Sequence, residues 1–110
     1  MYLTLILQVD DDILKNGVFV GQEVNTGTAK GNAPANARLF LNITELNAKQ
    51  VDISIVSTID GVNYELASFN KIKKPVVATE VAIACPARIR AIVTTKNVKK
   101  MKAKLFCERF

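Results

Sequence analysis

The residues that most often carry enzymatic chemistry are scarce in this 110-residue chain. It contains no histidine, the side chain that most often acts as a general base or a metal ligand. Three consecutive carboxylates, Asp10, Asp11 and Asp12, offer oxygen ligands to a cation such as Ca²⁺. Consecutive residues of an extended chain point to alternate faces, however, and no calcium-loop spacing follows them. We therefore expect a solvated acidic turn, with no metal and no cofactor.

The two cysteines, Cys85 and Cys107, are the remaining candidates for a nucleophile. Their spacing matches no zinc or redox motif, and the chain has no histidine to activate a thiol. Both occupy apolar positions of expected strands, which favours buried thiols; a disulfide between them is the alternative. Residues 27–31 (GTAKG) lack the spacing of a phosphate-binding loop. These observations predict that the protein is not an enzyme.

Basic side chains are concentrated in the last third of the sequence. Residues 1–70 carry four basic and eight acidic side chains, whereas residues 71–110 carry eleven basic and two acidic ones. The candidate partner-binding patch consists of Lys96, Lys99, Lys100, Lys102 and Lys104, and the wider basic set adds Lys71, Lys73, Lys74, Arg88 and Arg90. Three interpretations stay open: a solvated face whose lysines deter edge-to-edge aggregation, a docking surface for an acidic protein, and a nucleic-acid site. The low aromatic content of 6% disfavours nucleic acid.

The elements that would position these side chains are strands. Val and Ile recur with a period of two, and no window of eleven residues shows helical spacing. The strands are expected at 2–9, 13–15, 18–24, 37–46, 51–59, 64–69, 76–85, 87–96 and 101–110. In the run 76–85, the residues Val77, Val81 and Ile83 fall on one face. We expect a single domain, residues 1–110, with an all-β fold: an antiparallel sandwich of eight to nine strands in a jelly-roll or related Greek-key topology.

Turn signals separate several of these strands. Asn16-Gly17 predicts a type I′ hairpin that places residues 13–15 beside residues 18–24. Asp60-Gly61 predicts a second turn, and residues 25–36 (NTGTAKGNAPAN) predict a long exposed loop. No stretch approaches the ~20 apolar residues that cross a bilayer, and the apolar N-terminal run is too short for a signal-peptide core. We expect a soluble protein made without export.

One pair of segments resembles a known group of proteins. Residues 51–69 (VDISIVSTIDGVNYELASF) and 86–97 (PARIRAIVTTKN) are similar to small virion proteins of tailed bacteriophages, in which a strand enters an S-x-D-G-x-x-aromatic hairpin. The resemblance covers about the last two thirds of the chain. This sequence differs by Thr58-Ile59 before Asp60-Gly61 and by Tyr64 in place of a frequent Trp. Such hairpins also occur in discoidin-like and carbohydrate-binding sandwiches.

The turn motif consists of Asp60, Gly61, Asn63 and Tyr64. We expect Asp60-Gly61 to supply the turn, Asn63 to hydrogen-bond locally, and Tyr64 to cover the end of the sandwich. The resemblance implies a virion structural protein, assembled in the host cytoplasm, that decorates or cements a capsid. Its partners would be capsid or other virion proteins and further copies of itself, as a trimer or similar small ring. Residues 2–9 and 25–36 are candidate contacts with those neighbours.

Two alternatives to the virion role remain. A sandwich face can bind carbohydrate or another surface ligand, although the chain has no Trp and only Tyr2 and Tyr64 as tyrosines. Nucleic acid could bind through the basic C-terminal third. No membrane partner is expected.

Overall fold

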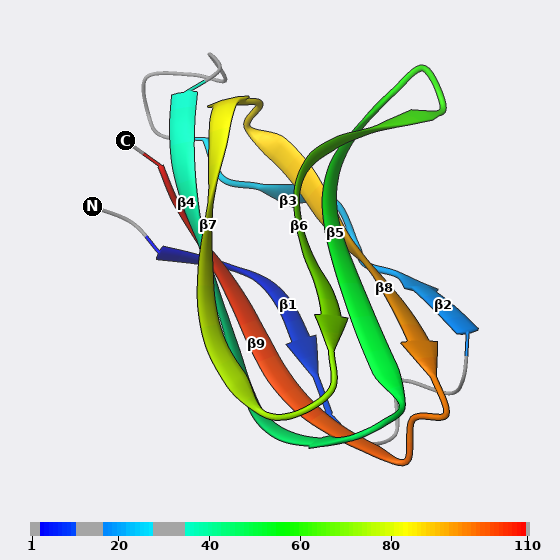
Figure 1. The fold of residues 1–110 in the computed structure, drawn as a ribbon. Coiled ribbons are helices and arrows are strands. Elements are labelled where there is room, and N and C mark those ends of the chain that lie inside the picture. Colours follow the sequence, from blue (N-terminus) through cyan, green and yellow to red (C-terminus); the bar gives the residue numbers. More distant parts are fainter. Residues whose placement is uncertain (1–2, 11–16, 28–34, 110) are drawn as a thin grey trace.

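A computed structural model describes residues 3–10, 17–27 and 35–109, and every regular element in these ranges is a β-strand (Figure 1). The strands are β1 (Leu3–Val9), β2 (Gly17–Val20), β3 (Val24–Asn25), β4 (Ala35–Asn47), β5 (Gln50–Ile59), β6 (Val62–Ile72), β7 (Val76–Cys85), β8 (Arg88–Lys96) and β9 (Lys100–Arg109). The expected all-β class is confirmed. Among the described residues, no helix is long and apolar enough to cross a membrane.

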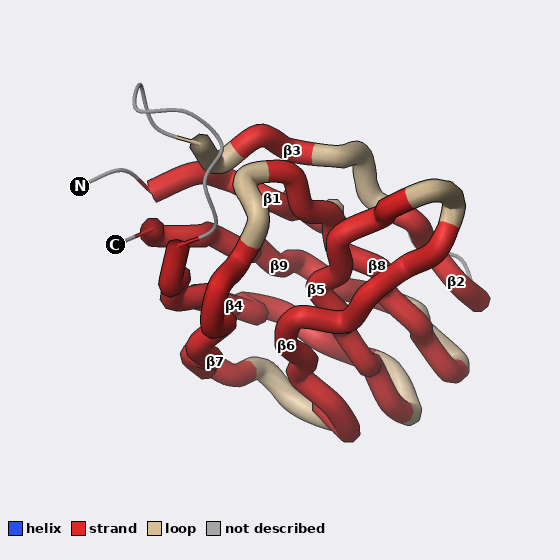
Figure 2. The backbone as a smooth tube through the Cα atoms, turned by 90° about the horizontal axis from the view of Figure 1, so that it is seen from above, coloured by secondary structure: helices blue, strands red, loops and turns tan. Residues whose placement is uncertain are grey.

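The strands form two antiparallel sheets packed face to face. One sheet has the order β1-β9-β4-β7, and the other has the order β2-β8-β5-β6, with β3 also pairing with β8. Seen from above, the two sets lie on opposite sides of the molecule (Figure 2). The chain can be traced as one long hairpin, whose paired segments are, from the open end to the apex, β1/β9, β2/β8, β4/β7 and β5/β6. The additional pairings β4/β9 and β5/β8 roll this hairpin into the two sheets. This arrangement is a jelly roll and confirms the expected sandwich.

The apex of the long hairpin is the turn between β5 and β6. Asp60 and Gly61 both have positive φ, 50° and 77°, and Ile59 pairs directly with Val62. A two-residue turn with positive φ at both positions has the type I′ geometry, whose twist matches that of the flanking strands. The expected turn at Asp60-Gly61 is therefore confirmed.

The core lies between the sheets and is filled by alternate residues of the central strands. Leu39 and Leu41 of β4, Ile53 and Ile55 of β5, and Leu105 of β9 have no measurable exposure. Each of these three strands therefore presents one buried apolar face and one more polar face, as the two-residue period predicts. Truncating such a Leu or Ile to Ala typically costs about 2–5 kcal/mol, because the cavity does not collapse completely.

The N-terminal third differs from the expected strand pattern. The expected strand 18–24 is divided at Gly21, whose amide donates a 2.8 Å hydrogen bond to the Ala91 carbonyl. A Cβ on Gly21 would stand 2.9 Å from that same oxygen, so the close approach to β8 requires glycine. Residues 13–16 lie outside the described part of the chain, so the expected Asn16-Gly17 hairpin is not described. Gly17 itself begins β2, which pairs with β8.

The expectation of one long loop over residues 25–36 is wrong at both ends. Asn25 pairs with Arg88 in β3, and Ala35 begins β4. Thr26 is buried because its amide and its hydroxyl both donate to the Ala87 carbonyl, at 2.7 and 3.0 Å. A polar side chain can sit in the interior when a backbone carbonyl satisfies it, and composition alone does not reveal this. Residues 28–34 lie outside the described ranges.

Candidate interaction surfaces

The acidic residues of the described chain do not gather into a metal site. Within residues 3–10, 17–27 and 35–109, no three His, Cys, Asp or Glu side chains lie close enough together to hold a metal ion. Asp10 follows β1 directly and is exposed, whereas Asp11 and Asp12 fall outside the described residues.

The two cysteines are buried free thiols. Cys85, at the end of β7, and Cys107, in β9, are both free and almost completely buried, so the disulfide alternative is wrong for this structure. Burial raises the pKa of both thiols, and for Cys107, with a smaller contribution from the nearby Cys85, it reaches about 11. A thiol with so high a pKa remains protonated at neutral pH and is a poor nucleophile.

The turn motif forms a tip that projects beyond the body of the sandwich (Figure 1). Thr58 Oγ1 donates a 2.7 Å hydrogen bond to Asn63 Oδ1 across the hairpin, so the expected local bond of Asn63 is confirmed. Tyr64, however, is 53% exposed and does not close the end of the sandwich, so that expectation is wrong. The reason is strand length, since β5 and β6 continue past their neighbours. The tip also exposes Ile59 and Val62.

Lysines from both halves of the sequence gather at the opposite end. The β4–β5, β6–β7 and β8–β9 turns lie together there, at the bottom of Figure 1. Backbone hydrogen bonds join two of these turns: the Lys49 amide donates to the Lys96 carbonyl at 2.9 Å, and the Lys99 amide donates to the Asn47 carbonyl at 2.7 Å. We call this surface the lysine end; it consists of Lys49, Lys71, Lys73, Lys74, Lys96, Lys99 and Lys100.

The structure divides the predicted basic patch. Lys96, Lys99 and Lys100 belong to the lysine end, whereas Lys102 and Lys104 follow β9 along the outer face of its sheet. The Nζ atoms of Lys100 and Lys102 lie 3.1 and 3.7 Å from Glu45 Oε2. The hydrogen bond from Lys100, together with both lysine charges, lowers the pKa of Glu45 from its ordinary value. Glu45 therefore offsets part of the charge on two of the five predicted lysines.

The wider basic set is also divided. Lys71, Lys73 and Lys74 join the lysine end, but Arg88 and Arg90 begin β8 at the other end of the sandwich, where Arg90 lies 3.5 Å from Glu23. Sequence reasoning missed Lys49, because it sits in the acidic half of the chain. The only available signal was its place in the expected turn between residues 46 and 51.

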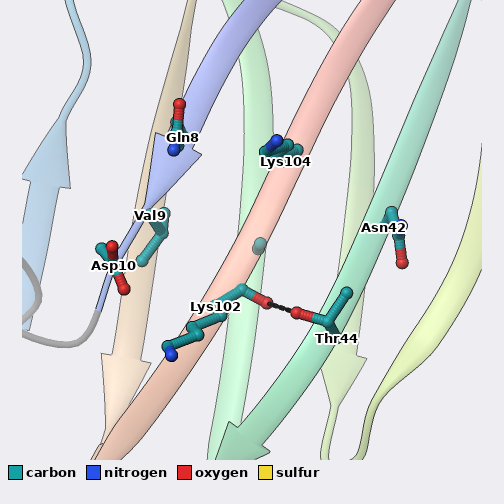
Figure 3. A pocket seen from close by; sticks show the side chains of 8 residues that line it. Gln8, Val9, Asp10, Asn42, Thr44, Lys102 and Lys104 are labelled. Atoms are coloured by element: carbon teal, nitrogen blue, oxygen red, sulfur yellow. Dashed lines mark hydrogen bonds between the residues drawn. The ribbon is translucent and has the colours of Figure 1, made fainter.

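A shallow hollow of about 300 Å³ lies on the outer face of the four-stranded sheet (Figure 3). Six polar side chains from three neighbouring segments line it: Gln8, Asp10, Asn42, Thr44, Lys102 and Lys104. Thr44 Oγ1 donates a 3.2 Å hydrogen bond to the Lys102 carbonyl. On the same face, two residues along β4 and β9 from Asn42 and Lys104, Phe40 pairs with Phe106, and both rings are half-buried. The hollow offers hydrogen-bonding groups beside an aromatic pair.

The edge strand β7 exposes an apolar face. Val77, Val81 and Ile83 are 77%, 54% and 79% exposed, and we call these three residues the apolar β7 face. The sequence pattern placed them on one face without saying which, and the structure turns that face to solvent. In the described part of the chain, β7 pairs only with β4 and so ends its sheet.

Comparisons with known proteins relate the chain to a solved structure at the level of fold alone. No protein-family model and no curated protein matches the sequence. One solved structure, described as "BiXyn10A CBM1 APO", is similar over 99% of this chain and 97% of that chain, with 11% identity and a TM-score of 0.46. No functional inference follows from so distant a likeness.

Proposed function

We propose that the protein is a non-catalytic structural subunit that associates with further copies of itself through β7, and that it decorates the shell of a virion. The observation that carries self-association is the apolar β7 face on a sheet edge that contains no Lys and no Pro. The resemblance of residues 51–69 to phage virion hairpins supports the virion setting.

The edge formed by β7 has little of the usual protection against pairing. Exposed edge strands are normally kept apart by lysines, by prolines or by inward-pointing charges. The ten residues of β7 contain no Lys and no Pro, and its only charge is Glu80. Glu80 pairs with the buried Leu39 and is therefore an inward-pointing charge, whereas the outer face of β7 carries no charge.

A second copy of this chain is the occupant that fits the edge. Strand β7 offers an unpaired row of backbone donors and acceptors, and the same strand on another copy offers the complementary row. Val77 and Ile83, near the two ends of the strand, would then be shielded from water. On one face of an antiparallel pair, opposed Val and Ile side chains contribute about 0.2–1 kcal/mol each, and together with the new backbone hydrogen bonds they favour association.

Sedimentation velocity tests self-association. Wild-type protein is expected to sediment as an oligomer at micromolar concentration, and the variant Val77→Lys with Ile83→Lys as a monomer. The control is Val18→Lys with Val20→Lys, which changes two comparably exposed valines on β2 of the other sheet and should leave the oligomer intact. Circular dichroism verifies that each variant folds. A wild-type protein that stays monomeric would remove the proposal.

The virion role needs a separate test. We expect the gene to lie beside capsid or portal genes and the protein to cosediment with shells assembled from that capsid protein. A gene among unrelated neighbours, with no cosedimentation, would contradict the virion role and leave self-association standing.

The hollow of Figure 3 favours carbohydrate binding as a second candidate function. Sugars combine a polar rim of hydroxyls with an apolar ring face, and Asn42 and Lys104 of the hollow lie two residues along β4 and β9 from the pair Phe40 and Phe106, on the same face. A glycan array is the test. A hit should weaken on Asn42→Ala and persist on Asn70→Ala, which alters an exposed amide on the other sheet, whereas a blank array would remove this candidate.

A further inference from the structure

We propose that the lysine end is a docking surface for an acidic protein, and that the hollow between the β4–β5 and β8–β9 turns receives an acidic side chain of that partner. The inference depends on the charge and shape of this end and requires neither the virion setting nor self-association.

Hydrogen bonds hold the backbone of the lysine end in place. The turn at Lys49 is hydrogen-bonded to Lys96, and the turn at Lys99 is hydrogen-bonded to Asn47, so the β4–β5 and β8–β9 turns cannot separate without breaking backbone bonds. The β6–β7 turn is attached on the other side, because the Lys71 amide donates a 2.8 Å hydrogen bond to Asp52 Oδ1. Lysines on turns that are already held in place lose less backbone entropy on binding than lysines on free loops.

Two carboxylates near this end, Asp52 and Glu45, are already engaged. Asp52 accepts the Lys71 amide and, at 2.9 Å, the side-chain amide of Gln50, and Glu45 lies against Lys100 and Lys102. All seven lysines of this end are exposed, and five of them take no part in the contacts just described: Lys49, Lys73, Lys74, Lys96 and Lys99. Like charges so close together repel one another, and an acidic partner relieves that repulsion.

A hollow of about 460 Å³ lies between the two hydrogen-bonded turns. Its lining is Asn47, Ala48, Lys49, Asn97, Val98 and Lys99. Ala48 and Val98 are half-buried and pack on the core, while Lys49 and Lys99 bring ammonium groups from the two turns. An apolar floor beneath cationic and amide donors suits the side chain of Glu, which has an apolar stem and an anionic head.

The chemistry of this end favours a protein over nucleic acid. All the described arginines lie in the opposite half of the sandwich, on β4 near its start, at the start of β8 and at the end of β9: Arg38, Arg88, Arg90 and Arg109. The lining of the hollow contains no aromatic side chain. Arginine forks and aromatic platforms are the features that read bases and stack single strands, and lysine alone supplies point charges.

Fluorescence anisotropy with labelled poly-L-glutamate tests the proposal, with a duplex DNA of equal total charge as competitor probe. The variant is Lys49→Glu with Lys99→Glu. The control is Arg88→Glu with Lys104→Glu, which changes the net charge equally but lies outside the lysine end. At low salt we expect the variant to lose about tenfold or more in affinity for poly-L-glutamate and the control to lose about twofold. The variant Lys73→Glu with Lys74→Glu should show a loss of affinity for poly-L-glutamate between these two values.

The outcomes separate the alternatives. Equal losses in variant and control would mean that net charge alone attracts the probe, and no binding of poly-L-glutamate by wild type would also overturn the proposal. Tighter binding of the duplex, lost in the same variant, would assign the surface to nucleic acid instead. Sedimentation velocity distinguishes this proposal from self-association, because the lysine variant and its control should both remain oligomeric even where binding of poly-L-glutamate is lost.

Discussion

The carboxylate of Asp52 accepts a 2.8 Å hydrogen bond from the backbone amide of Lys71, nineteen residues further along the chain. Lys71 has a φ of 57°, in the left-handed region, and the β5–β6 register shifts between the pairs Val51/Ile72 and Ile53/Phe69. Two residues of β6 therefore stand opposite the single residue Asp52, which is the geometry of a β-bulge. Asp52 secures this bulge and with it the start of the β6–β7 turn.

The first prediction concerns the pH dependence of stability. The hydrogen bonds from Lys71 and Gln50 lower the pKa of Asp52 below its ordinary value of 3.8. A carboxylate whose pKa is lower in the folded state stabilises the protein fully above the unfolded-state pKa, and this contribution is lost as the pH falls through the folded-state pKa. We expect Asp52→Asn to lower the free energy of unfolding by about 1 kcal/mol at pH 7, and by less in acid.

Urea unfolding between neutral and acidic pH measures this difference. The control is Asp60→Asn, because an Asn-Gly turn keeps the type I′ geometry while one carboxylate is removed. Unfolding free energies of wild type and Asp52→Asn that run parallel across the pH range would show that Asp52 makes no such contribution.

The second prediction compares two glycines. At Gly61 a Cβ would meet no atom within 4 Å. We therefore expect Gly61→Ala to lower the free energy of unfolding by only about 1 kcal/mol, the cost of holding an alanine at positive φ. At Gly21 a Cβ would press on the Ala91 carbonyl at 2.9 Å, and that oxygen belongs to the backbone of β8. We expect Gly21→Ala to lower the free energy of unfolding by more, about 2–3 kcal/mol, because β2 and β3 must move away from β8.

Thermal or urea unfolding of the two variants ranks these costs. Gly17→Ala is a useful third variant, since Gly17 also has a positive φ, 129°, and open space around a Cβ. If Gly21→Ala proved the mildest of the three, the close approach at Ala91 would not constrain the fold.

The third prediction concerns the buried thiols. Because burial raises the pKa of Cys85 and brings that of Cys107 to about 11, native protein should react with iodoacetamide at pH 8 at least about a hundredfold more slowly than urea-unfolded protein. Intact mass spectrometry should find both thiols reduced after purification without reductant. Rapid labelling of the native state, or a mass lower by two hydrogens, would contradict the buried free thiols.

Much of the fold could be predicted from local pattern. The two-residue period located most strands, because alternation of apolar and polar side chains is what a half-buried strand requires. Asp60-Gly61 marked the hairpin apex, because few residues adopt positive φ at both turn positions. The division at Gly21 could not be predicted, since it follows from the approach of Gly21 to Ala91, seventy residues away in sequence.

The candidate surfaces were predicted less completely. Lys96, Lys99 and Lys100 could be identified as neighbours because they are close in sequence, but Lys49 and Lys71 join them only through the sheet pairings β5/β8 and β5/β6. The exposed position of Tyr64 was missed, because the lengths of β5 and β6 relative to the other strands are set by tertiary contacts.

The sequence by itself determined the strand-rich class, the hairpin apex and the lack of histidine chemistry, because side-chain period, turn preference and residue type are local properties. Only the tertiary structure decided which face of β7 meets solvent, since both faces of Val76–Cys85 carry apolar residues and alternation alone cannot choose between them. Likewise, the rolling of one long hairpin into two sheets brought three distant turns together at the lysine end. The sequence gives the position of each charged residue along the chain, but these residues form a charged surface only when strands from both halves of the chain interleave.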